Sequence, residues 1–140
     1  MVKPALVLAL AASGVFLVTG MIVGVWKYRA MLGSPDHRAP MYVDIAHRAA
    51  LLYSFASLVI AKLLEYSPYS IAFELAATAA PLFFFAATIV TYIALGVRRE
   101  QDTQFRQRTF VTTWGMYLLI VGEIGGVAVL LAGALRTWLR

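Results

Sequence analysis

His47 is the only histidine that can lie inside an apolar stretch of this 140-residue chain. Bilayers discourage polar side chains, so an intramembrane imidazole, which also binds metals, marks a candidate functional site. A single histidine can hold a five-coordinate haem iron and leave the opposite face of the iron open for a small ligand. His37 is expected in a loop, so a haem with two histidine ligands is not predicted. The alternative is a structural role, in which the neutral imidazole donates a hydrogen bond to a backbone carbonyl.

Other polar side chains also fall within apolar stretches. Tyr92 is expected at about the depth of His47, and Tyr53 lies about 120° from His47 around the same helix. Either tyrosine alone is more often a packing residue with one hydrogen bond. Glu123 lies near the middle of the last stretch, where an ionised carboxylate is costly. Glu123 is therefore either a proton or cation site or a neutral acid that bonds a neighbouring helix.

The elements that position these residues are predicted to be membrane-spanning helices. The composition is 61% hydrophobic and 14% charged, and the mean hydropathy is +0.79. A helix needs roughly 20 apolar residues to cross a hydrocarbon core of ~30 Å, and backbone groups in lipid must be satisfied within each segment. The stretches that meet this length are residues 4–26, 43–64, 71–97 and 110–135. We therefore expect an all-α, integral membrane four-helix bundle that forms one domain over residues 1–140.

The first stretch ends in Val25-Trp26-Lys27 and lacks a small-residue cleavage site, which predicts a retained helix rather than a signal peptide. The chain has no cysteine, so a disulfide or thiolate chemistry is excluded. Nothing in it resembles a nucleotide-binding loop or a nucleic-acid module, and no nucleic-acid partner is expected. The partners expected are the lipid bilayer and a small apolar substrate.

The distribution of the basic residues that give the net charge of +5 mostly indicates how the protein is oriented in the membrane. The predicted first connection (27–42) and third connection (98–108), with the helix ends beside them, hold most of the basic side chains. These are Lys27, Arg29, Arg38, Arg48, Arg98, Arg99, Arg106 and Arg108. The opposite side holds Lys3, Lys62, Arg136 and Arg140. This asymmetry predicts a multi-pass protein of a bacterial-type inner membrane, with both termini outside and these two connections in the cytoplasm.

Two packing features are expected. Gly20-x-x-x-Gly24 and Gly122-x-x-x-Gly126 place small residues on one face of a helix, where a neighbouring backbone can approach closely. Lys62 and Glu74 lie on either side of the short predicted hairpin at 65–70. They are expected to form a structural ion pair or to extend to the interface.

Several of these residues together resemble a known family. They are Gly24-Val25-Trp26, Ala46-His47 with a polar residue six positions later, Tyr92, and a closing Gly-Val…Ala-Leu-Arg over 126–136. The pattern is similar to that of the styrene oxide isomerases, small four-helix membrane enzymes to which the hydroxylaminobenzene mutases are related. The similarity extends over most of the chain in length, helix count and the placement of His47 and Tyr92. The family typically has asparagine where this chain has Tyr53, and Glu123 is outside the family pattern.

The resemblance implies that His47 is the axial ligand of a haem b held at the subunit interfaces of a homotrimer. Ferric iron would act as a Lewis acid on an epoxide oxygen, and a 1,2-hydride shift would give an aldehyde, as in a Meinwald rearrangement. Tyr92 and Tyr53 are then the candidate catalytic residues, and Arg48 or Arg38 would pair with the haem propionates.

The aromatic residues Phe83-Phe84-Phe85 would stabilise positive charge that develops on the substrate.

Two other functions are compatible with the sequence. In a small four-helix transporter, Glu123 would exchange protons for a hydrophobic cation. Small multidrug exporters have their membrane glutamate in the first span, whereas the apolar first span of this chain is uncharged. A non-catalytic membrane subunit of a larger complex would use the paired-glycine faces for assembly.

Overall fold

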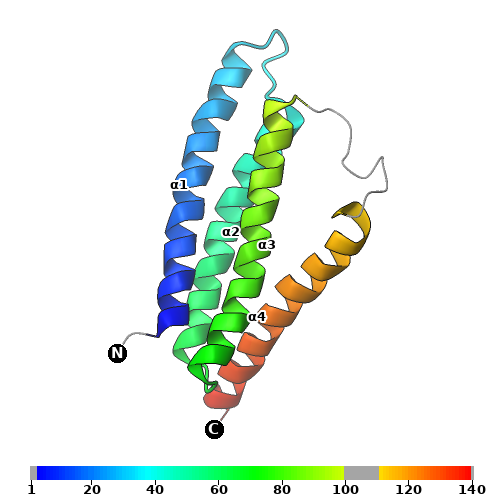
Figure 1. Ribbon diagram of the computed structural model, residues 1–140. Helices are drawn as coiled ribbons and strands as arrows, with labels where there is room; N and C mark the ends of the chain where they lie inside the picture. Colours follow the sequence, from blue (N-terminus) through cyan, green and yellow to red (C-terminus); the bar gives the residue numbers. More distant parts are fainter. Residues whose placement is uncertain (1–2, 100–110, 140) are drawn as a thin grey trace.

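The computed structural model describes residues 3–99 and 111–139. This part of the chain forms α1 (Pro4–Leu32), α2 (Met41–Glu65), α3 (Ile71–Val97) and α4 (Met116–Trp138), and a π-helical turn at Val111–Gly115 leads into α4. The described residues contain no strand, and four helices are long and apolar enough to cross a membrane. The predicted all-α membrane bundle is confirmed (Figure 1).

The first helix is longer than its apolar stretch, so the prediction of a loop over 27–42 is wrong. α1 continues to Leu32, and Gly33 closes it by donating its N–H to the carbonyl of Arg29 at 3.1 Å. Hydropathy marks where a helix leaves the lipid, but a helix ends where breakers such as Gly33 and Pro35 occur. The connection to α2 is therefore limited to residues 33–40.

The other boundaries lie close to the predicted ones. α2 begins and ends within two residues of the predicted 43–64, and α3 matches the predicted 71–97. α4 continues to Trp138, past the predicted end at 135. Most of the predicted third connection and the predicted start of the last span at 110 lie outside the described residues.

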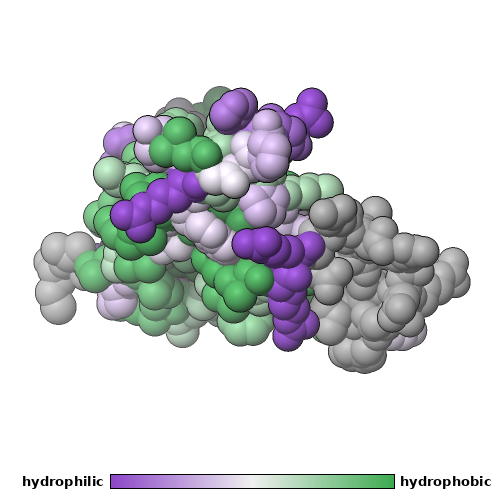
Figure 2. Space-filling view, turned by 90° about the horizontal axis from the view of Figure 1, so that it is seen from above, coloured by the Kyte–Doolittle hydropathy of each residue, from purple (hydrophilic) through white to green (hydrophobic). Residues whose placement is uncertain are grey.

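The helices α1, α2 and α3 lie side by side, whereas α4 diverges from them toward its own N-terminus (Figure 1). Within the described residues the backbone of α4 closely approaches those of α3 and α2 but not that of α1. Most large side chains exposed along the helices are apolar. The end formed by the α1–α2 connection shows hydrophilic side chains gathered at its surface (Figure 2), and which side of a membrane it faces stays a prediction.

The paired glycines act as expected, because they let two helix pairs pack closely. A Cβ on Gly20 would lie 2.7 Å from Cδ2 of Leu51 on α2. A Cβ on Gly126 of α4 would lie 2.5 Å from the carbonyl oxygen of Ala77 on α3. Pro81 has no N–H to donate to Ala77 within α3, so this carbonyl is exposed to α4. Only glycine allows α4 to cross here.

The predicted pairing of Lys62 with Glu74 is wrong. Glu74 is almost completely buried, and its Oε1 accepts a hydrogen bond from Lys3 Nζ at 2.8 Å. Lys3 also donates to the carbonyl oxygens of Leu64 (3.0 Å) and Ser67 (2.9 Å). Lys62 instead pairs with Glu65 on its own helix. The start of α1 is thereby tied to the connection between α2 and α3, a contact between segments far apart in the sequence.

We predict that Lys3→Met lowers the free energy of unfolding by about 2 kcal/mol, because it leaves the buried Glu74 carboxyl without its cation. The loss is smaller than for a fully buried pair, since the Lys3 side chain is 35% exposed. Tryptophan fluorescence during denaturation in detergent measures it. Lys62→Met, which removes an exposed pair, is the matched control and should cost less than ~1 kcal/mol. Equal losses in the two variants would contradict this role of Lys3.

Candidate functional site

His47 lies on the face of α2 that packs against α1. Its Nδ1 is 2.8 Å from the carbonyl oxygen of Gly20. Because a carbonyl oxygen can only accept, Nδ1 carries a proton, and an imidazole with its single proton on Nδ1 has its lone pair on Nε2. No described residue forms a hydrogen bond with Nε2. Metal-binding histidines commonly have this arrangement, in which one ring nitrogen donates to a carbonyl and the other binds the metal.

The position of the imidazole depends on Gly24. A Cβ on Gly24 would lie 2.9 Å from Cε1 and 3.1 Å from Nδ1 of His47. The two glycines of the motif thus have separate roles, since Gly20 provides the carbonyl and Gly24 provides the space. About two helical turns from His47, Ser13 Oγ donates to the carbonyl oxygen of Ser54 at 2.9 Å, a second hydrogen bond between α1 and α2.

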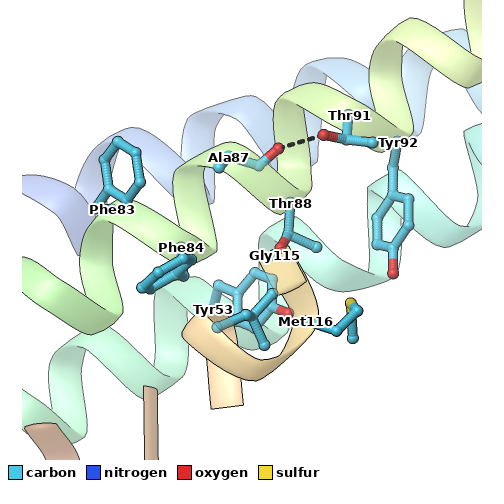
Figure 3. Close-up of a pocket in the computed structure, with 10 residues that line it drawn as sticks. Tyr53, Phe83, Phe84, Ala87, Thr88, Thr91, Tyr92, Gly115 and Met116 are labelled. Carbon is cyan, nitrogen blue, oxygen red and sulfur yellow. Dashed lines mark hydrogen bonds between the residues drawn. The ribbon is translucent and has the colours of Figure 1, made fainter. Parts of the chain in front are cut away.

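A cavity of about 320 Å³ lies where α4 diverges from α3. Its lining is mostly apolar with a few hydroxyl groups, as is typical of small-molecule sites. The lining residues are Tyr53, Phe83, Phe84, Ala87, Thr88, Thr91, Tyr92, Gly115, Met116 and Leu119. Figure 3 shows Tyr53 and Tyr92 on either side of Met116, which belongs to the start of α4.

Stacking holds both tyrosine rings in place. Tyr53 stacks on Phe85 with ring centroids 4.2 Å apart, and Tyr92 stacks on Tyr42 at 6.0 Å. The side chains of Tyr53 and Thr88 interact through their hydroxyl groups. Thr91 donates its hydroxyl to the carbonyl of Ala87 at 2.8 Å within α3 (Figure 3). The phenol groups thus have defined positions at the cavity.

A second cavity of about 290 Å³ lies beside the first and is also lined by Tyr53 and Tyr92. Arg48 is at its edge, together with Ile45, Ala49 and Leu52. Arg48 pairs with Asp44 at 2.9 Å, and Asp44 also pairs with Lys27 of α1 at 2.6 Å. Asp44 was not predicted as part of the site, although its position four residues before Arg48 and in the first turn of α2 favours such a pair.

Arg38 lies in the exposed connection between α1 and α2, away from both cavities. Its backbone N–H donates to Asp36 Oδ1 at 3.4 Å. A hydrogen bond from the Ser34 hydroxyl is the main cause that lowers the pKa of the Asp36 carboxyl. His37 lies in the same exposed connection, as expected, with a left-handed φ of 53°.

The structure therefore brings together some of the predicted site residues but not all of them. Tyr53 and Tyr92 share both cavities, and Arg48 joins them at the second. His47 lines neither cavity, because it faces α1 while Tyr53 faces α3. This difference agrees with the angle of about 120° between His47 and Tyr53 on a helix.

Glu123 lies one turn after Leu119 on α4. Its Oε1 is buried and has no hydrogen-bond partner among the described residues. The carboxyl group is close enough to act electrostatically on the phenols of Tyr53 and Tyr92. The sequence left two interpretations of Glu123, a proton or cation site and a neutral acid bonded to a neighbouring helix. The missing partner at Oε1 gives no support to the second.

The described residues contain no cluster of three or more histidine and carboxylate side chains that could bind a metal ion. A bare metal ion needs several protein donors, whereas haem iron needs a single axial ligand from the protein. His47, with Nδ1 bonded and Nε2 without a hydrogen-bond partner among the described residues, fits the requirement for haem.

Comparison with known proteins gives no matching family model, no matching curated protein and no matching solved structure. The resemblance to styrene oxide isomerases therefore remains an interpretation of the residues.

We predict that Gly24→Ala destabilises the protein by about 1–2 kcal/mol, because its methyl group displaces the His47 imidazole. Gly14→Ala on the same helix is the matched control, since a Cβ there meets nothing within 4 Å. It should be neutral or stabilising by up to ~1 kcal/mol. In a double-mutant cycle, His47→Ala should remove most of the cost of Gly24→Ala. A cost that persists in the His47→Ala background would contradict the contact.

Proposed function

We propose that this chain is a membrane-embedded, haem b-dependent isomerase that opens an epoxide or a similar small apolar substrate and rearranges it to a carbonyl compound. The observation that carries the proposal is the hydrogen bond between His47 Nδ1 and the Gly20 carbonyl. It orients the imidazole, fixes its tautomer and leaves Nε2 as the donor for iron. The resemblance in sequence supplies the reaction type.

The residues available to hold the cofactor are His47 at the iron and Arg48 and Arg38 at the propionates. The Arg48 side chain is largely exposed and lies one residue from His47, so it remains accessible to an anion despite its pair with Asp44. When bound, ferric haem supplies a Lewis acid for the epoxide oxygen. The reaction is an intramolecular rearrangement, and it requires no added oxidant, reductant or water.

The cavity suits the substrate. Its aromatic walls accept an aryl group, and Phe83 and Phe84 are placed to stabilise positive charge at the benzylic carbon. The phenols of Tyr53 and Tyr92 offer hydrogen bonds to the oxygen on which negative charge develops. An apolar substrate partitions into the bilayer, which accounts for a cavity within the membrane-spanning helices.

Within one chain His47 and the cavity face different sides of α2. The proposal therefore requires a homo-oligomer, in which the edge of the α1–α2 pair where His47 is partly exposed meets the cavity of the next copy. This requirement agrees with the homotrimer that the resemblance implies. It also gives the paired glycines a role, because they bring α1 close to α2 at the level of His47.

We expect the purified protein, supplied with haem, to convert a phenyl-substituted epoxide to the aldehyde. Tyr92→Phe should lower kcat/KM by about 10–100-fold, because it removes a hydrogen-bond donor to the developing oxyanion and keeps the ring. Gas chromatography of the product measures the rate. Tyr117→Phe, an exposed tyrosine on α4, is the matched control and should have no effect. An isomerase activity unaffected by Tyr92→Phe would exclude this residue, and the absence of any aldehyde would contradict the proposed reaction.

A further inference from the structure

Glu123 is the one acidic residue of α4, and the proposed isomerase reaction gives it no role. We propose that Glu123 is the anionic end of a binding site for a small protonated amine, whose apolar body occupies the cavity beside Tyr53, Phe84 and Tyr92. This site goes beyond the proposed function and requires no haem.

Glu123 lies just beyond the residues of α4 that line the cavity. Leu119 lines the cavity, and Glu123 follows it by one helical turn on the same face of α4. The carboxyl group acts electrostatically on Tyr53 from α2 and on Tyr92 from α3. The carboxyl group is therefore within electrostatic reach of two cavity residues, although Glu123 does not itself line the cavity.

On the C-terminal side of Glu123, α4 packs closely against its neighbours, which leaves no room for a ligand there. A Cβ on Gly126 would lie 2.5 Å from the Ala77 carbonyl oxygen, and one on Gly133 would lie 2.5 Å from Cε2 of Tyr69. The helices diverge only toward the N-terminus of α4, where Gly115 and Met116 line the cavity. A ligand that reaches Glu123 therefore has its body on the cavity side.

The chemistry of the site favours a cation over a neutral or anionic ligand. Oε1 of Glu123 is buried without a hydrogen-bond partner among the described residues, and the described residues that line the cavity include no lysine, arginine or histidine. A buried carboxylate is costly unless a cation pairs with it. An ammonium group offers N–H donors to the carboxylate and to the tyrosine oxygens. The faces of Tyr53, Phe84 and Tyr92 add attraction for a positive charge.

Calorimetric titration of the full chain in lipid nanodiscs tests the site with two probes of similar shape, benzylammonium and neutral benzyl alcohol. Empty nanodiscs correct for partition into lipid. We expect Glu123→Gln to weaken benzylammonium binding by about tenfold or more, because a charge-assisted hydrogen bond is lost. Benzyl alcohol binding should change by less than about threefold. Glu65→Gln is the matched control. Glu65 is exposed, and it pairs with Lys62 at the C-terminal end of α2. Benzylammonium affinity that is unchanged in Glu123→Gln would overturn the proposal.

Ala87→Phe fills the cavity and leaves the carboxyl group intact, so it tests the site even if Glu123→Gln fails to fold. We expect it to weaken both probes, and unchanged benzylammonium binding in this variant would also overturn the proposal. His47→Ala separates this inference from the haem proposal. Benzylammonium binding that persists in His47→Ala supports an amine site independent of haem, whereas its loss there would contradict the assignment to Glu123.

Discussion

The close approach of α1 to α2 is the contact on which the candidate site depends. Lipid provides no hydrophobic force between helices, so association relies on close packing and interhelical hydrogen bonds. Gly20 and Gly24 allow this packing, and the His47 imidazole occupies the space that they leave. At the same contact Nδ1–H of His47 donates to the Gly20 carbonyl, and Nε2 has no hydrogen-bond partner among the described residues. One interaction therefore both packs α1 against α2 and orients the proposed iron ligand.

The path of α4 determines where a ligand can bind. Near its C-terminus α4 is held against α3 and the α2–α3 connection, through Gly126 and Gly133. Toward its N-terminus it diverges, and the cavity opens beside Tyr53 and Tyr92 (Figure 1). Both phenols are fixed by stacking on Phe85 and Tyr42, so the polar groups of an otherwise apolar cavity are preorganised. Glu123 lies at the boundary between the packed and the open part of α4.

Much of the fold follows from the sequence, because a backbone in lipid must form helices and hydropathy locates them. The glycine pairs likewise predicted the close contacts, since glycine spacing alone identifies a face without Cβ atoms. The end of α1 was missed because hydropathy does not mark a helix terminus. The Lys3–Glu74 pair was missed because it joins segments distant in the sequence. Helical spacing gave the angle between His47 and Tyr53, but not that His47 packs on α1 and Tyr53 on α3.

The most direct test of the central claim, that His47 holds a haem iron, is the visible absorption spectrum of the protein purified from haem-supplied cells. We expect a Soret band in the wild type, its loss in His47→Ala and its retention in His37→Ala, which changes the other histidine, in an exposed connection. A wild-type protein without a Soret band, or a band that is unchanged in His47→Ala, would show that His47 holds no haem iron.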